Sequence, residues 1–429
     1  MSETATTSPV DRTARALYAL LDLSKALGSE VDLDALLSVI IEKASAVVDA
    51  ERTSIFVYEA GREVLWTHHG QGITGVIEVP VGSGIAGDVA RTRRLTNVAD
   101  AYADPRFNRE ADTRSGSRTR SILAAPVLDS AGTLLGVVES INKKSAERFD
   151  AEDESLMGAI ASHVAVAMER ARLTSTYIEH ERMGEALKLA SEIQMRMLPA
   201  GVIDLGDGAP FEIHAYLRPA RMVGGDLYDF AVHGNRLYFC LGDVSGKGIG
   251  SALVMALTKT LFRANVPYFD DAALLTEAVN VRLCEDTGPT MFVTAFCGYL
   301  DLSDGLLRFC NAGHDRPFVL RPDGSAELLQ SKPGLALGVL PAFRYPLQEI
   351  RLAVGEALFL YTDGVTEATS RSEELFGLDR LHEALDRSEE ASALRIIAGV
   401  TDAVERFVEG APQSDDLTML CVRYRGGDR

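Results

Sequence analysis

Apolar and polar positions in the N-terminal part of the chain alternate between helix spacing and strand spacing. From Thr13 to Ala50 apolar residues recur every three or four positions, which predicts helix. Short apolar runs then predict strands at 54–58, 64–67, 76–81, 121–128 and 133–142. A glycine-marked helix start lies at 82–90, and a further helix begins near Ala151. This pattern predicts one α+β domain over residues 13–172, preceded by a polar, disordered tail at 1–12.

Residues 160–198 have helix-forming composition without proline, and Pro199 ends the run. The apolar positions of this segment are Val164, Met168, Ala171, Ile178, Leu187, Ala190, Ile193 and Met197. Their heptad spacing is imperfect around 174–180. Such a helix between two domains is either the seam of a parallel homodimer or a linker packed on one domain of a monomer. We prefer the homodimer and place the helical linker at 173–199.

Strand spacing dominates the C-terminal half, interrupted by two helical blocks at 249–264 and 272–284. Strands are expected at 211–218, 228–231, 236–243, 292–301, 306–311, 318–321, 356–362 and 418–424. This pattern predicts a second domain in which two sheets pack on each other between helices.

Composition narrows the class of protein. A chain of 429 residues is too long for one core, so two domains are expected. The net charge of −19 opposes binding to nucleic acid. The five cysteines form no C-x-x-C pair, which is typical of a reducing compartment. With no signal peptide and no apolar run long enough to span a membrane, we expect a cytoplasmic protein.

Four stretches of the C-terminal half carry Asp beside glycine or at the end of an apolar run: Val223–Asp229, Gly242–Gly248, Tyr361–Glu367 and Ser414–Thr418. One such Asp is usually a turn or N-cap residue. Several carboxylates that converge on one cleft repel one another unless a cation neutralises them, and hard oxygen ligands favour Mg²⁺ or Mn²⁺. The set therefore predicts a metal-dependent hydrolase whose catalytic residues are Asp226, Asp243, Asp363 and Asp415.

In this order, the motifs resemble the PPM-type (protein phosphatase 2C-like) serine/threonine phosphatases of the bacterial SpoIIE/RsbU branch. The likeness covers residues 200–425 and includes Asn311–His314, and Ala190–Pro199 is similar to the helix that leads into these domains. The resemblance implies an α-β-β-α sandwich with two Mn²⁺ or Mg²⁺ ions. It also implies a phosphorylated substrate protein, a STAS-type anti-anti-sigma factor.

The resemblance assigns roles to individual residues. The implied metal ligands are Asp226, Asp243, the Val244 carbonyl, Asp363, Asp415 and Asp416. Asp243 would bridge the two ions, while Asp416 stands where eukaryotic relatives carry Asn and Asp229 would support the ligands. Two divalent ions roughly 4 Å apart can turn a bridging water into hydroxide near neutral pH and bind the phosphate oxygens. Neither a Cys nor a Ser nucleophile is then needed.

Three further features of this half have more than one interpretation. His314 would either protonate the leaving oxygen or stabilise a turn of the fold. Bacterial members of this branch lack the phosphate-binding Arg of their eukaryotic relatives, and Arg221 is a candidate substitute for it. Gly246-Lys247-Gly248 does not complete the G-x-x-x-x-G-K-[ST] pattern, so a P-loop kinase or ATPase is excluded.

Residues 13–172 resemble GAF domains, above all the cyclic-nucleotide-binding GAF domains of phosphodiesterases and adenylyl cyclases. The likeness rests on Gly84–Gly87, on Asp100–Asn108 and on a complete Asn-Lys-Phe-Asp-Glu set. That set is Asn142, Lys143, Phe149, Asp153 and Glu154. We expect Lys143 and Asp153 to form an internal salt bridge.

By resemblance this GAF domain would bind cAMP or cGMP. The expected ligand-contacting residues are Ile85, Ala86, Asp112, Ser115, Thr119 and Glu139. The amides of Ile85 and Ala86 would hold the cyclic phosphate at a helix start. Ser117 replaces the usual aromatic residue after Ser-Gly. The alternative is therefore a GAF domain that binds another small molecule or serves only for dimerisation.

Together these features predict a signal-regulated, metal-dependent protein-serine/threonine phosphatase with a GAF sensor. A catalytically silent, nucleotide-dependent scaffold is the alternative, although the retained Asp set argues against it. A cyclic-nucleotide phosphodiesterase is disfavoured, because the eight His residues are scattered and form no His/Asp metal cluster.

Overall fold

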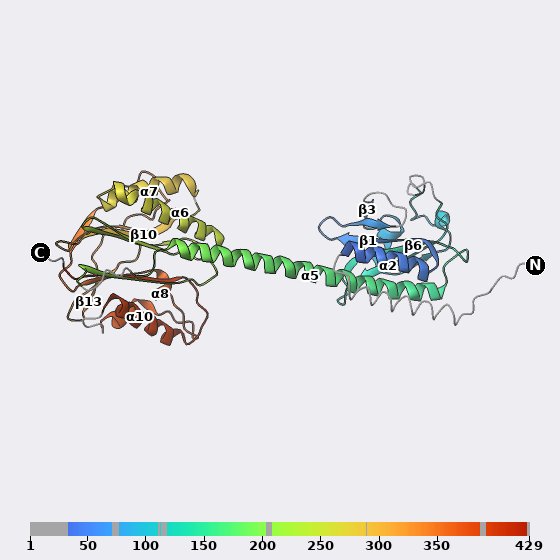
Figure 1. Ribbon diagram of the computed structural model, residues 1–429. Coiled ribbons are helices and arrows are strands. Elements are labelled where there is room, and N and C mark those ends of the chain that lie inside the picture. The colour runs from blue at the N-terminus through green and yellow to red at the C-terminus, as the bar shows by residue number, and fades with distance from the viewer. Residues whose placement is uncertain are drawn as a thin grey trace, which may run out of the picture. The chain divides into compact units, whose positions relative to one another are not determined.

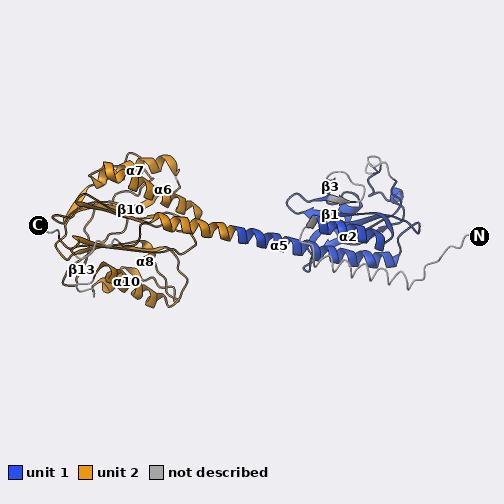
Figure 2. Ribbon diagram, in the orientation of Figure 1, with its two compact units in different colours: residues 1–182 blue, residues 183–429 orange. Residues whose placement is uncertain are grey.

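The computed structural model describes residues 33–70, 77–109, 112, 118–202, 208–288, 290–386 and 392–426. The chain divides into two compact units, residues 1–182 and residues 183–429 (Figures 1 and 2). The expected tail at 1–12, the first part of the predicted helix at 13–50, and Ser115 lie outside the described residues. Within the described ranges, no helix combines the length and apolar content needed to cross a membrane.

Unit 1 is built on one antiparallel sheet in the order β3-β2-β1-β6-β5-β4. Its strands are β1 (Ala50–Glu59), β2 (Val64–Gly70), β3 (Ile77–Pro80), β4 (Thr96–Val98), β5 (Ile122–Leu128) and β6 (Leu134–Lys143). Helix α2 (Leu33–Val47) and the start of α5 (Ala151–Met197) share one apolar cluster with the sheet. Helix α3 (Gly84–Thr92) shares a second cluster with it, and η1 (Ala101–Ala103) follows β4. The α+β prediction for this domain is confirmed.

Helix α5 runs without interruption for 47 residues. Its first turns bury Met157, Ile160 and Val164 in the core of unit 1. Farther along, Leu173 and Tyr177 are 60% and 67% exposed, so no core of the described chain covers them. Near its C-terminal end the helix becomes part of unit 2, where Leu198 just beyond it joins the core.

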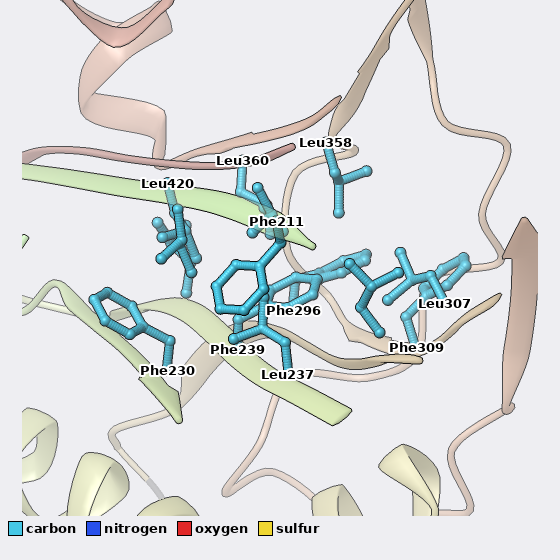
Figure 3. Close-up of a cluster of buried hydrophobic side chains, with 14 of the residues drawn as sticks. Phe211, Phe230, Leu237, Phe239, Phe296, Leu307, Phe309, Leu358, Leu360 and Leu420 are labelled. Carbon is cyan, nitrogen blue, oxygen red and sulfur yellow. The ribbon is translucent and has the colours of Figure 1, made fainter. Parts of the chain in front are cut away.

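Unit 2 consists of two five-stranded antiparallel sheets, β14-β11-β10-β9-β8 and β13-β12-β15-β16-β7. The first contains β8 (Leu227–His233), β9 (Arg236–Val244), β10 (Val293–Asp301), β11 (Leu306–Ala312) and β14 (Gln348–Arg351). The second contains β7 (Phe211–Arg218), β12 (Phe318–Leu320), β13 (Ala326–Leu328), β15 (Ala357–Tyr361) and β16 (Leu417–Tyr424). Apolar side chains from both sheets meet in one core, in which the Phe296 and Phe309 rings stack with centroids 5.1 Å apart (Figure 3).

Helices cover the outer faces of both sheets and complete the α-β-β-α sandwich (Figure 1). Helices α6 (Ile249–Asn265) and α7 (Ala272–Asp286) lie on the first sheet, with η2 (Val266–Tyr268) between them. Helices α9 (Gly377–Leu385) and α10 (Ala393–Val408) pack with the second sheet, and the short α8 (Asp363–Thr366) follows β15. The fold prediction is confirmed.

The prediction of only two helical blocks in this half was wrong, because α9 and α10 were missed. Helix α10 buries Ile396, Ile397, Val400 and Val404 on one face. This spacing is that of an amphipathic helix. Ser392 caps it by accepting a hydrogen bond from the Arg395 amide. The signal was therefore present in the sequence.

Candidate metal centre and candidate sensor residues

The carboxylate cluster of unit 2 collects side chains from the ends of both sheets. Asp243 is the penultimate residue of β9 and pairs with Thr294 on β10. Asp226 directly precedes β8, and Asp363 opens α8 after β15. Asp415 and Asp416 precede β16. The charges of these residues act on one another's pKa values, so the structure brings the predicted Asp residues of all four motifs together.

Two glycines leave room for this cluster. A Cβ on Gly224 would lie 2.1 Å from Asp416 Oδ2, and a Cβ on Gly225 would lie 3.0 Å from the Val244 carbonyl oxygen. Any side chain at Gly224 would push the Asp416 carboxylate aside, so the Gly-Gly pair before Asp226 is a steric requirement of the site.

Asp226 is buried and held by two hydroxyls. Thr362 Oγ1 donates a hydrogen bond to Asp226 Oδ2 at 2.8 Å, and Thr418 Oγ1 donates another to the same oxygen. Burial and the charge of Asp243 raise the pKa of Asp226 well above its usual value, whereas the Thr418 and Thr362 hydroxyls oppose this rise. One carboxylate oxygen is thus fixed by protein donors.

The pKa values of Asp243 and Asp363 show the effect of neighbouring carboxylates. Burial and the charge of Asp363 raise the pKa of Asp243 to about 7. Burial and the charges of Glu367 and Asp415 raise the pKa of Asp363 to about 6. Repulsion between carboxylates contributes to both shifts, so a nearby cation would stabilise the ionised forms.

Asp415 and Asp416 have different surroundings. Lys247 Nζ lies 2.6 Å from Asp415 Oδ2 and donates a hydrogen bond to the Ser414 carbonyl at 2.8 Å. The Asp416 carboxylate accepts hydrogen bonds from the amides of Ala220 and Gly225 at 2.8 and 2.7 Å. Asp416 therefore orders the loop before Asp226, and Lys247 supplies a positive charge beside Asp415.

This donor set fits a hard divalent ion in its chemistry. Every candidate side chain is a carboxylate, and burial and neighbouring carboxylate charges raise the pKa values of Asp243 and Asp363. As they stand, no three or more His, Cys, Asp or Glu side chains among the described residues are arranged to hold a metal. Asp226, Asp415 and Asp416 instead face hydroxyl, ammonium and amide donors.

A pocket opens beside the cluster. Its lining residues are Ala220, Arg221, Val223, Gly224, Gly225, Asp243, Gly246, Lys247, Gly248, Ser251, Asp415 and Asp416. Arg221 and Lys247 are the two basic residues among them. The pocket is thus lined both by positive side chains and by the carboxylates of Asp243, Asp415 and Asp416.

His314 stabilises the fold beside the site. Its Nδ1 lies 2.9 Å from Thr294 Oγ1, and its Nε2 lies 3.1 Å from the Tyr361 carbonyl oxygen. Burial lowers the pKa of His314 to about 4. The neutral ring thereby ties β10 to β15, which precedes Asp363. Of the two interpretations of Asn311–His314, the turn fits these contacts and the general acid does not.

Asp229 does not face the cluster. Its carboxylate is fully buried and pairs with Arg263 on α6, which also donates to the Phe230 carbonyl. Burial raises the pKa of Asp229, and the Arg263 hydrogen bond and charge oppose this rise. The expected support of the metal ligands is replaced by a structural ion pair.

The candidate sensor residues of unit 1 are mostly buried. Ile85 and Ala86 lie in the first turn of α3, and their side chains join the core. Asp112 accepts hydrogen bonds from the Thr119 amide and hydroxyl, both at 2.6 Å, and from the Tyr102 hydroxyl at 3.1 Å. Asp112 and Thr119 are therefore hydrogen-bonded to each other, and no local sequence pattern indicates this pair.

The other residues of unit 1 that the resemblance singled out lie in and beside β6. Burial raises the pKa of Glu139 on β6 to about 7. Lys143 Nζ lies 2.8 Å from Asp153 Oδ1 with both side chains buried, so the predicted internal salt bridge is confirmed. Asn142 accepts a hydrogen bond from the Arg120 amide. These contacts tie β6 to α5 and to the segment around Thr119.

Comparisons with known proteins agree with the two units. Residues 32–168 match the family model of the GAF domain, and residues 233–425 match that of Stage II sporulation protein E (SpoIIE). The chain is 34% identical to Protein IcfG of Synechocystis sp. over 267 residues, 56% of this chain and 41% of IcfG. It is 31% identical to the dual 3',5'-cyclic-AMP and -GMP phosphodiesterase 11A of Takifugu rubripes over 191 residues, 40% of this chain and 21% of that protein.

The chain thus spans less than half the length of both relatives. Among solved structures, the SiaA-PP2C domain of Pseudomonas aeruginosa is similar at a TM-score of 0.51 and 22% identity, covering 57% of this chain and 98% of that domain. This likeness supports the sandwich fold. The chain therefore combines a GAF domain with a SpoIIE-type phosphatase domain of the PP2C-like fold, joined by a long helix.

Proposed function

We propose that the SpoIIE-type domain hydrolyses phosphoserine or phosphothreonine on a protein substrate with two bound Mn²⁺ or Mg²⁺ ions. The observation that carries this proposal is the convergence of Asp243, Asp363 and Asp226, whose pKa values are raised by burial and by the charges of neighbouring carboxylates. Such a cluster favours divalent cations. The match of residues 233–425 to the SpoIIE family gives independent support.

The residues of the site would have different roles in this reaction. Asp226, Asp243, the Val244 carbonyl, Asp363 and Asp415 would hold the ions, with Asp416 ordering the loop at Gly225. Bound divalent ions supply hydroxide near neutral pH and neutralise phosphate charge. Arg221 and Lys247 line the pocket where the phosphate would lie. Thr362 and Thr418 would keep Asp226 oriented.

Hydrolysis of p-nitrophenyl phosphate and of a phosphothreonine peptide by the full chain tests this proposal. Turnover that requires Mn²⁺ or Mg²⁺ and disappears in Asp243→Asn supports it. Metal-independent turnover contradicts the two-ion site, and no turnover with either ion supports the alternative of a catalytically silent, nucleotide-dependent scaffold.

The substrate we propose is a phosphorylated STAS-type anti-anti-sigma protein, on the strength of the SpoIIE/RsbU resemblance. Incubating the full chain with such a phosphoprotein and an unrelated phosphoprotein would distinguish a dedicated phosphatase from a general one. A dedicated enzyme releases phosphate from the first substrate much faster than from the second.

We infer that the GAF domain binds cAMP or cGMP and controls the phosphatase. Similarity to a phosphodiesterase named for both nucleotides supports this inference, as do the buried Asp112–Thr119 pair and the α3 helix start. Calorimetric titration of the full chain with cAMP and with cGMP tests it. Failure of both nucleotides to bind would favour a different ligand or a purely dimerising domain.

We also propose a cytoplasmic homodimer that forms through α5. Several large apolar side chains of this helix are exposed: Val166, Leu173, Tyr177, Met183, Leu189 and Ile193. A second copy of the helix would remove them from water. Analytical ultracentrifugation of the full chain and of Leu173→Glu measures the oligomeric state, and a monomeric wild type contradicts the proposal.

A further inference from the structure

Gln194 lies in the last turn of α5 and is buried, unlike its neighbours Ile193 and Met195. A buried amide side chain needs hydrogen-bond partners, because leaving it unsatisfied costs free energy. Gln194 finds both partners on a single residue 30 positions away, Gly224.

The pairing has the form of a peptide–peptide contact. Gln194 Nε2 donates a hydrogen bond to the Gly224 carbonyl at 2.6 Å, and the Gly224 amide donates to Gln194 Oε1 at 3.1 Å. Both backbone groups of Gly224 are therefore satisfied by one side chain of the helix. The contact lies entirely within unit 2.

Gly224 belongs to the segment that places Asp226. The next amide, that of Gly225, donates to Asp416 Oδ2 at 2.7 Å. At Gly224 itself a Cβ would lie 2.1 Å from this same carboxylate oxygen. Gly224 and Gly225 thus lie between the end of α5 and the Asp416 carboxylate, and Asp226 follows directly.

The C-terminal end of α5 is anchored near Asp226 by two further contacts. Leu198 joins the apolar core directly after α5, and the Tyr228 hydroxyl donates a hydrogen bond to the Pro199 carbonyl at 3.0 Å. Tyr228 lies on β8, two residues after Asp226. The helix end is therefore linked to the chain on both sides of Asp226.

We propose that Gln194 is a positioning residue that fixes the Gly224–Asp226 segment and so transmits changes in α5 to the carboxylate cluster. This inference deepens the proposed phosphatase function and rests on it. Gln194 touches neither the pocket nor a carboxylate and acts only through the Gly224 backbone.

The test compares Gln194→Leu and Gln194→Glu with Glu192→Leu, an exposed position on the same helix. Leu removes both hydrogen bonds and leaves the Gly224 groups without a partner, whereas Glu keeps an acceptor for the Gly224 amide. We expect Mn²⁺ affinity, measured by calorimetry on the full chain, to fall about ten-fold in Gln194→Leu and less in Gln194→Glu. Glu192→Leu should bind like the wild type.

Hydrogen exchange supplies the readout that a merely structural role would not produce. The Gly224 and Gly225 amides should exchange faster in Gln194→Leu while amides in the β9 and β10 core keep their wild-type protection. Unchanged Mn²⁺ affinity together with unchanged exchange at Gly224 overturns the inference. If Gln194→Leu does not fold, Gln194→Glu decides by the same two measurements.

The outcome separates this inference from the proposed function. A wild type that binds Mn²⁺ but has no phosphatase activity contradicts the function and leaves the positioning role measurable. An active wild type whose Gln194 variants keep both the wild-type Mn²⁺ affinity and the wild-type exchange at Gly224 contradicts the positioning role alone.

Discussion

The two units differ in whether their named buried polar side chains face complementary partners or like charges. In unit 1 the side chains are matched: Lys143 pairs with Asp153, and Asp112 accepts from Thr119. In unit 2 the pKa values of Asp226, Asp243 and Asp363 are each raised by burial and by the charge of at least one neighbouring carboxylate. A matched pair has each buried charge compensated within the protein, whereas a crowded set of like charges needs a cation from outside.

This difference bears on how each unit would respond to a ligand. A cation entering unit 2 would relieve repulsion that is already present. A ligand entering unit 1 would have to replace hydrogen bonds that are already made, such as those between Asp112 and Thr119. The first process favours tight binding, and the second favours a conformational response.

The largest effect is expected for Asp243→Asn. Removing the central charge should lower Mn²⁺-dependent turnover at least about a thousand-fold, because several kcal/mol of transition-state stabilisation depend on the metal site. The metal-free protein should keep or raise its melting temperature, because repulsion with Asp363 is relieved. Kinetic assays and scanning calorimetry measure the two effects.

Asp229→Asn is the matched control for this experiment. It removes a buried carboxylate that pairs with Arg263 and lies outside the cluster. The control should lower the melting temperature and leave Mn²⁺ affinity unchanged. A variant Asp243→Asn that behaves like Asp229→Asn would break the distinction between crowded and matched carboxylates.

How much of this site was visible in the sequence depends on whether the contacts are local. Asp226, Asp243, Asp363 and Asp415 were found because each lies beside glycine or a strand end, and the structure brings them together. The Asp229–Arg263 pair joins residues 34 positions apart, and no periodicity signals it. The loop-ordering contacts of Asp416 likewise depend on the tertiary fold, because they join residues about 190 positions apart.

The fold shows the same limit. Runs such as Arg236–Val244 were predicted as strands because their side chains are apolar over most of their length. Helix α10 was missed although its buried residues recur at helical spacing. The pairing order of the ten strands in two sheets follows from long-range contacts that no local pattern encodes.

The second largest effect is expected for the matched pair of unit 1. Lys143→Met leaves Asp153 buried without its cation, which should lower the free energy of unfolding by about 3 kcal/mol. Denaturant titration of the full chain measures this loss. Arg62→Met removes an exposed ion pair with Glu78 and serves as the control. Equal effects of the two variants would contradict the importance of burial.

A smaller effect is expected for Thr119→Ala. The change removes a hydroxyl that bonds to Asp112 in the structure and that we expect to contact a cyclic nucleotide. Binding of cAMP or cGMP should weaken by about 1–2 kcal/mol, as measured by calorimetry. Thr176→Ala, at an exposed position of α5, should leave the isotherms unchanged. Indistinguishable isotherms for Thr119→Ala and wild type would remove this residue from the ligand site.

The smallest effect is a pH dependence to which the crowded carboxylates of unit 2 contribute. The pKa values of Asp243 and Asp363 are raised to about 7 and about 6, above the usual value of 3.8. Between these limits the folded state binds more protons than the unfolded state, so stability falls as pH rises from about 4 to about 7.

In EDTA, the melting temperature of the full chain should therefore fall over this range. Asp243→Asn should show a shallower fall because one of the groups with a raised pKa is gone. Mn²⁺ should stabilise the wild type more at pH 8 than at pH 5.5. Parallel pH profiles for the two proteins would show that Asp243 is not strained by its neighbours, and the contrast between the units would then rest on geometry rather than on charge.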